Sequence, residues 1–283
     1  MMALHFVPML RIGSLEFESP AVMGILNVTP DSFSDGGQFQ SHEAALRQAE
    51  AMAADGAAII DIGGESTRPG AQGVSEQEEL DRVLPIIEAL TPHLDVPISI
   101  DTSKAAVMRA AIAAGASMIN DIRALREDGA LDAAAELQCP VCLMHMQGQP
   151  RTMQSDPAYH DVVAEVRDFL LERVEACRQA GIAKELLILD PGFGFGKTPA
   201  HNVELLVNLR QFRDAGLPVL AGLSRKSTLG ELTGREVEDR MPASVAAAVV
   251  AAMQGADIVR VHDVRETVDA LRVVRAVLEQ EKS

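Results

Sequence analysis

Eight short apolar runs alternate with eight longer amphipathic or alanine-rich segments along this chain of 283 residues. The runs are 22–26, 57–60, 96–100, 117–119, 141–144, 186–189, 218–223 and 257–259, and the segments are 42–54, 76–90, 104–114, 129–137, 158–180, 201–213, 241–254 and 265–279. Strands that alternate with helices pair in parallel, and eight such units close into a barrel. The sequence therefore predicts an α/β fold, a (β/α)8 TIM barrel, in a single domain over residues 1–283. An open doubly wound sheet is the alternative, but no Gly-x-Gly-x-x-Gly follows the first run.

Glycines mark the ends of the predicted helices. Five of these helices are followed by a glycine, at positions 56, 115, 181, 216 and 255. Glycine just beyond a helix end adopts the left-handed conformation at little cost, so this spacing supports the repeat count independently. Residues 5–18 differ from the repeats, because two short runs meet at Gly13 and Ser14. They predict a short N-terminal β-ribbon that caps the amino-terminal end of the barrel.

The charge balance argues against two kinds of partner. The formal net charge is −16, and the chain has no tryptophan and one tyrosine. An acidic chain poor in aromatic residues is a poor match for nucleic acid or for an anionic membrane surface. No apolar stretch reaches the roughly 18 residues of a membrane span, and the amino terminus lacks the pattern of a signal peptide. We therefore expect no nucleic-acid partner and no membrane partner.

The cysteines indicate the compartment. There are three, Cys139, Cys142 and Cys177, and a small odd number suits a reducing compartment, so we expect a cytoplasmic protein. Cys139 and Cys142 form a CxxC pair, which in other contexts binds zinc or carries redox chemistry. Here both lie near one predicted strand, where residues three apart face opposite sides. A structural role for the pair is therefore favoured.

A polar residue stands at or just after the end of each predicted strand. In order these residues are Asn27, Asp61, Asp101, Asn120 with Asp121, His145, Asp190, Ser224 to Lys226, and Arg260 with His262. Singly each has a structural explanation, such as a helix cap at Asp101 or a turn at Asp190. Together they converge on the face where barrel enzymes carry their active sites. Acceptors dominate the first strands and cations the last two, which predicts a ligand with a donor-rich edge and an anionic group.

Two loops are longer than a barrel needs and are predicted to act as lids. They follow the first two strands, at 29–38 and 63–73, and their candidate lid residues are Phe33, Asp35, Ser66 and Arg68. Arg68 is placed to reach an anion. A third segment, 190–197, is rich in glycine but lacks the Walker spacing. Its glycines are expected to let the backbone approach a flat ligand beside Phe193 or Phe195.

Several motifs resemble the signatures of dihydropteroate synthases. The longest are NVTPDSFSDGG at 27–37, DIGGESTRPG at 61–70 and DPGFGFGK at 190–197. Shorter ones are SIDT at 99–102, ND at 120–121, LMH at 143–145, GLSRKS at 222–227 and RVH at 260–262. They occur in order from about Val22 to the last helix. Pro242 departs from the family, which commonly has glycine there, and this affects helix packing rather than chemistry.

The resemblance implies a reaction and a set of ligands. It implies condensation of 6-hydroxymethyl-7,8-dihydropterin diphosphate with 4-aminobenzoate, giving dihydropteroate and diphosphate in folate biosynthesis. It also implies a Mg²⁺ ion, a homodimer and inhibition by sulfonamides. The substrate-binding positions that it assigns are Asp101, Asn120, Met144, Asp190 and Lys226 around the pterin, Arg68, Arg260 and His262 around the diphosphate with Asn27 on the metal, and Thr67, Pro69, Phe195 and Ser227 around the aminobenzoate. Asp61 and Gly222 are further substrate-binding positions. Asp101, Asp190, Lys226, Arg260 and His262 are the expected catalytic residues.

The chemistry explains these residue types. A carboxylate accepts two adjacent N–H groups of the pterin, and cations stabilise the diphosphate as it leaves. The aminobenzoate amine is neutral at neutral pH, so we expect a dissociative displacement without a strong base, with the carboxylate received at the helix that starts near Ser227. Three alternatives remain: a pterin-binding methyltransferase that uses methyltetrahydrofolate and a corrinoid protein, a Schiff-base aldolase that uses Lys226, and a barrel that binds without catalysis.

Overall fold

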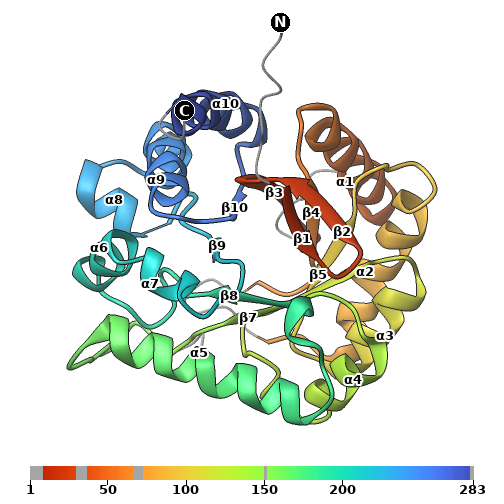
Figure 1. Cartoon of the computed structure of the whole chain (residues 1–283). Coiled ribbons are helices and arrows are strands. Elements are labelled where there is room, and N and C mark those ends of the chain that lie inside the picture. Colours follow the sequence, from red (N-terminus) through yellow and green to blue (C-terminus); the bar gives the residue numbers. More distant parts are fainter. Residues whose placement is uncertain (1–8, 30–36, 67–72, 150–151, 281–283) are drawn as a thin grey trace, which may run out of the picture.

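The computed structural model describes residues 9–29, 37–66, 73–149 and 152–280 and contains a barrel of parallel strands (Figure 1). The strands are β3 (Ala21–Asn27), β4 (Ile59–Gly63), β5 (Ile98–Asp101), β6 (Met118–Asp121), β7 (Val141–Met144), β8 (Leu187–Asp190), β9 (Leu220–Ala221) and β10 (Ile258–Val261). They pair in the order β8-β7-β6-β5-β4-β3-β10-β9. A parallel bridge between Leu189 and Val219 joins the two edge strands and closes the ring. The predicted fold class is confirmed.

Helices surround the strands on the outside (Figure 1). They are α1 (Gly37–Ala54), α2 (Glu76–Leu90), α3 (Ala105–Ala113), α4 (Ala130–Leu137), α5 (Val162–Gln179), α6 (Pro199–Val207), α7 (Arg210–Arg213), α8 (Ser227–Thr233), α9 (Met241–Met253) and α10 (Val264–Gln280), with short 3₁₀ turns η2 (Lys184–Leu186) and η3 (Val237–Asp239). All five glycines predicted to follow helices have a positive φ, between 68° and 116°. Pro242 lies in the first turn of α9, where a missing N–H costs nothing. None of the helices in the described ranges is long and apolar enough to cross a membrane.

Two predicted elements are wrong in extent, beyond shifts of a few residues at the ends of others. The helix expected over 201–213 is two helices, because Asn208 caps α6 and its side chain donates to the Glu204 carbonyl at 2.9 Å. An asparagine that bonds to the backbone in this way competes with helix continuation. The strand expected over 218–223 is reduced to Leu220–Ala221. Pro218 has no N–H for the ladder, and only its carbonyl is used, by Leu189.

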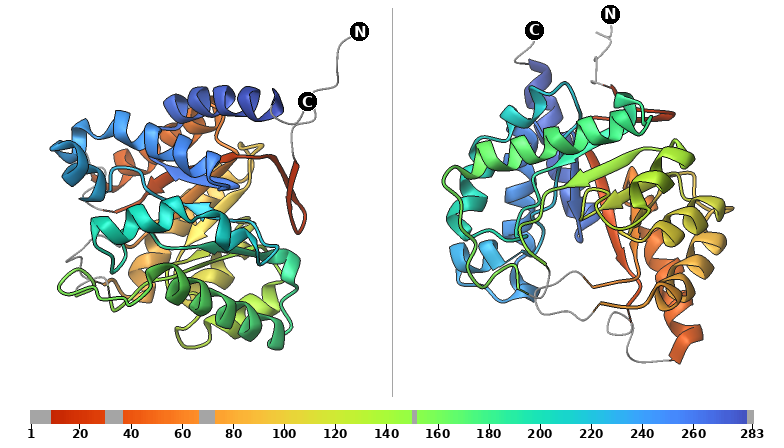
Figure 2. Two further views of the ribbon diagram at one scale, coloured as in Figure 1. Left: turned by 60° about the vertical axis from the view of Figure 1, so that its left-hand side comes forward. Right: turned by 90° about the horizontal axis from the view of Figure 1, so that it is seen from below.

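The predicted ribbon is present and closes one end of the barrel. Strands β1 (Met9–Ile12) and β2 (Leu15–Glu18) pair in antiparallel around Gly13, whose φ is +59°. Leu10, Ile12 and Phe17 pack on an apolar layer inside the barrel. The ribbon, drawn in red, lies at one end of the strands in the first of the two side views (Figure 2). It therefore seals the end opposite to the carboxyl ends of the strands.

Because of the strand pleat, polar side chains also point into the barrel interior. They lie next to this apolar layer, on the side of the carboxyl ends of the strands. Met118, Ile188 and Ile258 belong to the inner apolar layer, and so does Ile59. Because side chains two apart on a strand face the same side, the residues two positions further on also face inward. These are Asp61, Asn120, Asp190 and Arg260. The fold thus places four of the predicted site residues on one face at the same height.

The cysteines divide between two sides of the strand as expected. Cys142 packs in the inner layer, whereas Cys139 packs in the outer core between strands and helices. All three cysteines are free and buried. Burial raises the pKa of the Cys139 and Cys177 thiols to about 11, so these groups stay protonated at neutral pH. They are packing residues.

Candidate active site

The centre of the site is an arginine held by two carboxylates. Arg260 donates from Nε to Asp61 at 2.6 Å and from Nη2 to Asp101 at 2.7 Å. Asn120 donates to the same Asp61 oxygen at 3.0 Å. The other oxygen of Asp61, Oδ1, is buried and has no hydrogen-bond partner among the described residues. The centre of the site therefore holds one buried acceptor that is unpaired.

Burial sets the protonation of this centre. It raises the pKa of Asp101 to about 7, with Arg260 opposing the rise and Asp61 adding to it. Burial lowers the pKa of Arg260, but the two carboxylates outweigh it and the net change is upward. The arginine therefore remains a cation, and Asp101 changes charge near neutral pH.

A lysine and an aromatic ring lie on the other side of the site. The Lys226 ammonium donates to the Phe193 carbonyl at 2.5 Å and lies 4.6 Å from the centre of the Phe195 ring. Burial lowers the pKa of Lys226 to about 8, and Asp190 opposes that change. Burial raises the pKa of Asp190, and Lys226 opposes it. Asp190 also accepts the Gly192 N–H at 2.7 Å, so it both starts a turn and faces the site.

Two glycines leave room between these groups. A Cβ on Gly222 would lie 3.8 Å from both Arg260 Cβ and Lys226 Nζ. A Cβ on Gly63 would lie 3.5 Å from Asp101 Cβ. The space between the acceptors and Lys226 therefore exists because these two positions are glycines. A flat ligand requires such a space.

The remaining predicted site residues within the described ranges stand at or just after strand ends on the same face of the barrel. Met144 is buried in a small cluster with Phe195. Ser227 is exposed at the first position of α8. Asn27, half-buried, ends β3 and pairs in register with Gly63. The Ser224 hydroxyl lies 3.0 Å from His262 Nδ1 and also accepts the His262 backbone N–H at 3.2 Å.

One feature predicted from the sequence is wrong. The acceptors and cations were expected in two separate halves, but the Arg260 guanidinium lies among the acceptors. Arg225, expected with the cations, forms an ion pair with Asp263 instead. Its backbone has φ of 59°, and its N–H donates to Ser244 at 2.9 Å. Arg225 thus turns the chain so that Lys226, the next residue, faces the site.

The lid predictions fall mostly outside the described residues. This applies to Phe33, Asp35 and Arg68, and also to Thr67 and Pro69, which were predicted to line the aminobenzoate pocket. Ser66 is described and half-buried at the start of the second loop.

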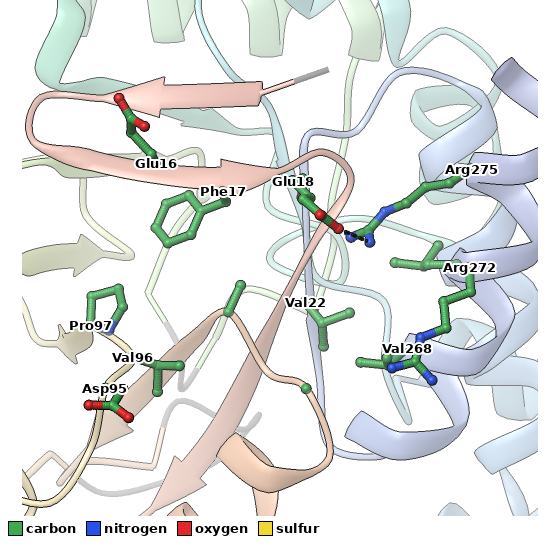
Figure 3. Close-up of a pocket in the computed structure, with 13 residues that line it drawn as sticks. Glu16, Phe17, Glu18, Val22, Asp95, Val96, Pro97, Val268, Arg272 and Arg275 are labelled. Atoms are coloured by element: carbon green, nitrogen blue, oxygen red, sulfur yellow. Dashed lines mark hydrogen bonds and ion pairs between the residues drawn. The ribbon is translucent and has the colours of Figure 1, made fainter. Parts of the chain in front are cut away.

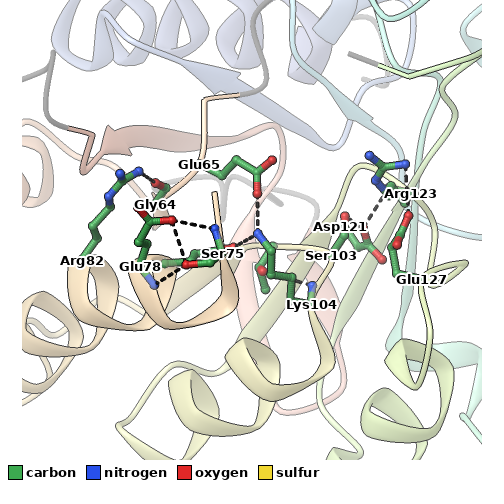
Figure 4. Close-up of polar contacts among 12 residues, drawn as sticks. Gly64, Glu65, Ser75, Glu78, Arg82, Ser103, Lys104, Asp121, Arg123 and Glu127 are labelled. Carbon is green, nitrogen blue, oxygen red and sulfur yellow. Dashed lines mark hydrogen bonds and ion pairs between the residues drawn. The ribbon is translucent and has the colours of Figure 1, made fainter. Parts of the chain in front are cut away.

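The base of that second loop is fixed by an ion-pair group (Figure 4). Lys104 contacts both Glu65, in the loop, and the buried Glu79, on α2. These carboxylates outweigh the effect of burial and raise the pKa of Lys104. At the far end of the loop Ser75 and Glu78 form a capping box that starts α2. Both ends of the loop are therefore anchored.

Two structural residues were not singled out from the sequence. They are Lys197 and Lys104, which hold loops that carry the site. Lys197 lies within a motif noted above, but no neighbour in the sequence indicates its partners.

A hollow of about 410 Å³ lies at the opposite end of the barrel, between the ribbon and α10 (Figure 3). Its charged groups include Glu18 and Arg275, which pair at 2.8 Å. It lies near the amino-terminal ends of the strands, where barrel residues serve stability rather than catalysis. The polar site described above is the candidate active site.

Known proteins share both the fold and the sequence of this site. A family described as pterin binding enzyme matches residues 23–262, so fold and site define a pterin-binding barrel enzyme. The dihydropteroate synthase of Escherichia coli (strain K12) is 58% identical over 265 residues, which is 94% of each chain. The Yersinia pestis dihydropteroate synthase with a sulfonamide drug has a TM-score of 0.91 at 56% identity, covering 95% of this chain and 99% of that one. The Xanthomonas albilineans enzyme with 4-aminobenzoic acid has a TM-score of 0.90 at 55% identity, covering 96% and 99%.

The chain belongs to the dihydropteroate synthase family. The identity extends over nearly the whole chain, and it supports this assignment over the methyltransferase alternative.

Proposed function

We propose that the described site residues divide between two substrates of one condensation. 6-Hydroxymethyl-7,8-dihydropterin diphosphate and 4-aminobenzoate combine to give 7,8-dihydropteroate and diphosphate. The observation that carries the proposal is that Asp61, Asp101 and Asn120 form one hydrogen-bonded group with Arg260, and that Gly222, without a side chain, leaves space between Arg260 and Lys226.

The pterin is proposed to lie in this space. Its amino-pyrimidinone edge carries adjacent N–H donors, which match the carboxylate of Asp190. Asp101 and Asn120 receive the other side of the ring, and Lys226 donates to ring acceptors. Met144 is buried beside the same space and supplies an apolar surface for the ring face.

The diphosphate is proposed to lie toward the carboxyl ends of β3 and β10. Arg260 and His262 are on β10 and directly after it, and Asn27 ends β3, the neighbouring strand. With Ser224 at Nδ1, His262 can direct Nε2–H at a phosphate oxygen. These groups stabilise charge that grows on the leaving group.

The residues fit a hydrated Mg²⁺ better than a protein-bound cage. No group of three or more His, Cys, Asp or Glu is placed to bind a metal within the described ranges. Mg²⁺ commonly keeps several waters and binds one or two protein oxygens together with phosphate oxygens. The Asn27 amide fits that role, and bound Mg²⁺ neutralises charge on the diphosphate. Arg260 and His262 hold the diphosphate whether or not the metal is bound.

The displacement is proposed to be dissociative. The C–O bond to diphosphate breaks with its electron pair leaving on oxygen, and the electron-rich ring stabilises the methylene carbon. The neutral amine of aminobenzoate then forms the C–N bond and releases one proton to solvent. Phe195 and Ser227 flank the aminobenzoate, with Ser227 near the carboxylate. The protein's contribution is alignment and charge stabilisation.

A direct assay tests this function. Diphosphate release is measured after mixing dihydropterin diphosphate with aminobenzoate, with and without Mg²⁺. We expect release only when both substrates are present, and a faster rate with Mg²⁺. Methyl transfer from methyltetrahydrofolate without diphosphate release would instead support the methyltransferase.

We further propose a homodimer formed through α9 and α10. Val250 and Met253 are exposed on α9, and Val273 and Val277 are exposed on α10. The two helices are neighbours (Figure 1), and the proposal is that a second copy buries these exposed apolar side chains. Light scattering should give twice the chain mass, and Val250→Glu with Val273→Glu should give a monomer. A wild-type monomer at micromolar concentration would contradict the proposal.

The cytoplasm is the proposed compartment. It rests on the three free, buried thiols, which persist where the surroundings are reducing. Fractionation of cells should recover the protein with cytoplasmic markers.

A further inference from the structure

The loop after β8 has an unusual arrangement of its backbone. Five consecutive carbonyl oxygens, from Gly192 to Gly196, each accept a side-chain donor. The donors are Lys197 to Gly192 at 3.0 Å, Lys226 to Phe193 at 2.5 Å, Gln154 to Gly194, Lys197 to Phe195 at 3.1 Å and Tyr159 to Gly196 at 2.8 Å. A loop without strand or helix partners is thus held at every carbonyl.

Lys197 makes two of these five contacts from inside the protein. It is 2% exposed, and its third donor direction points to His145 Nδ1 at 2.9 Å. An ammonium has three hydrogens, and four acceptors lie around this one, the fourth being the His145 carbonyl oxygen at 3.5 Å, so none of the hydrogens is directed to a substrate. Burial lowers the pKa of His145 to about 2, and Lys197 contributes, so the ring is neutral and can accept. Burial also lowers the pKa of Lys197, to about 7, with Asp190 opposing.

The same lysine connects two strand ends. His145 follows β7, and its backbone N–H donates to the Asp190 carbonyl at 3.0 Å. The loop packs so closely on this segment that a Cβ on Gly192 would lie 1.9 Å from the His145 carbonyl oxygen. The Gly192 N–H in turn donates to the Asp190 carboxylate. A change at Lys197 therefore reaches Asp190 through the backbone of one residue, Gly192.

We propose that Lys197 is a positioning residue that fixes the 190–196 loop, so that Asp190 meets the pterin and Phe195 meets the aminobenzoate. This inference rests on the proposed function for the identity of the two ligands. Lys197 acts through the loop carbonyls and touches neither substrate. Loss of its hydrogen bonds should loosen both subsites at once, whereas a residue of one subsite affects only its own ligand.

Lys197→Met is the main test, and Lys184→Met is the matched control. Lys184 also donates to a backbone carbonyl, that of Ala215 at 2.7 Å, but it lies just before β8, at the opposite end of the strand from the site. In Lys197→Met we expect KM for each substrate to rise by roughly tenfold or more, the effect of losing hydrogen bonds from a charged donor. In Lys184→Met both KM values should stay within about twofold.

The single tyrosine gives a second, independent readout. Tyr159 bonds to Gly196 in this loop, and the chain has no other tyrosine and no tryptophan. Burial raises the pKa of Tyr159, so its phenolate appears late in a pH titration followed by ultraviolet absorbance. In Lys197→Met the phenolate should appear at lower pH, with unchanged far-ultraviolet circular dichroism. Lys184→Met should titrate like the wild type.

The outcomes separate the inference from the function on which it rests. Unchanged KM values for both substrates in a folded Lys197→Met protein overturn the positioning role, even if kcat or stability falls. If that variant does not fold, Lys197→Gln keeps two N–H donors and should show a smaller rise in both KM values, and unchanged values again overturn the role. Failure of the wild type to release diphosphate overturns the proposed function instead. The tyrosine titration and the affinity for a pterin alone then still test Lys197.

Discussion

Arg260 donates to Asp61 at 2.6 Å, although 199 residues separate them in the sequence. They face each other because β10 and β4 lie on either side of β3. The same guanidinium reaches Asp101 on β5, so one cation neutralises carboxylates from two strands. The last strand of the barrel thereby completes a site that the early strands begin.

This arrangement predicts that Arg260 supports stability as well as binding. Arg260→Met leaves Asp61, which is 0% exposed, without its cation. Removing one partner of a buried ion pair typically costs about 3–5 kcal/mol. Chemical denaturation should show a loss in this range, and Asp61→Asn combined with Arg260→Met should recover part of it. An unchanged free energy of unfolding in Arg260→Met would show that the pair contributes nothing.

Asp101→Asn should damage the use of the pterin substrate. The amide keeps the shape but loses the charge, and hydrogen bonds to charged groups contribute about 1.5–3 kcal/mol, which corresponds to roughly 10- to 150-fold. We expect kcat/KM for the pterin diphosphate to fall in this range. KM for aminobenzoate should change little, and steady-state kinetics with each substrate varied in turn measures both. A rise confined to the aminobenzoate KM would contradict the pterin assignment.

Ser227→Ala should have the opposite selectivity. Ser227 is exposed at the start of α8, beside Lys226, and its hydroxyl is proposed to meet the aminobenzoate carboxylate. Loss of one such bond costs about 0.5–1.5 kcal/mol, so KM for aminobenzoate should rise by roughly 2- to 13-fold. Calorimetric titration with a pterin alone serves as the control and should give the wild-type affinity. Weaker pterin binding would place Ser227 in the other subsite.

The pH dependence follows from three buried groups. Asp101 accepts N–H bonds at both of its oxygens only when ionised, and its pKa is raised to about 7, so activity should be lost as the pH falls through that value. Lys226 and Lys197 donate fully only when protonated, and their pKa values are lowered to about 8 and about 7, so activity should also be lost as the pH rises through that range. The profile of kcat/KM for the pterin substrate should therefore be a narrow bell. Asp101→Asn should remove its acid limb, and a variant that keeps this limb would assign it to another group.

Much of this site was predictable because a parallel barrel brings all carboxyl strand ends to one face. Asp61, Asn120, Asp190 and Arg260 each follow an inward apolar residue by two positions, a pattern that is visible in the sequence. The pairing among them was not predictable, since residue type does not say which acceptor an arginine reaches. The expected separation of acceptors and cations was wrong for that reason.

Lys197 shows a second limit of sequence reasoning. Its partners are backbone carbonyls and one histidine 52 residues away. A carbonyl is present at every residue, so it leaves no trace in the sequence. The glycines of the same loop were noticed, but the space beside Gly192 and Gly196 depends on His145 and Gln147, which come from the loop after β7, and the space beside Gly194 depends on Lys226.

The glycines themselves give the last prediction, because two of them have opposite consequences. Gly222→Ala places a methyl group between Arg260 and Lys226 at ordinary contact distance, 3.8 Å from each. The fold tolerates it, but the methyl group occupies the proposed pterin space. Gly192 has φ of +69°, and its Cβ would lie 1.9 Å from the His145 carbonyl oxygen, so Gly192→Ala forces the backbone to move.

We expect Gly222→Ala to keep the wild-type Tm while pterin affinity falls by roughly tenfold or more, a cost on the scale of overpacking a tight site. Gly192→Ala should lower Tm by several degrees, since a cost of about 1–3 kcal/mol at a residue of this kind shifts Tm by about that much. Thermal denaturation and pterin titration on both variants test the contrast. If Gly222→Ala binds the pterin normally, the ligand does not lie between Arg260 and Lys226.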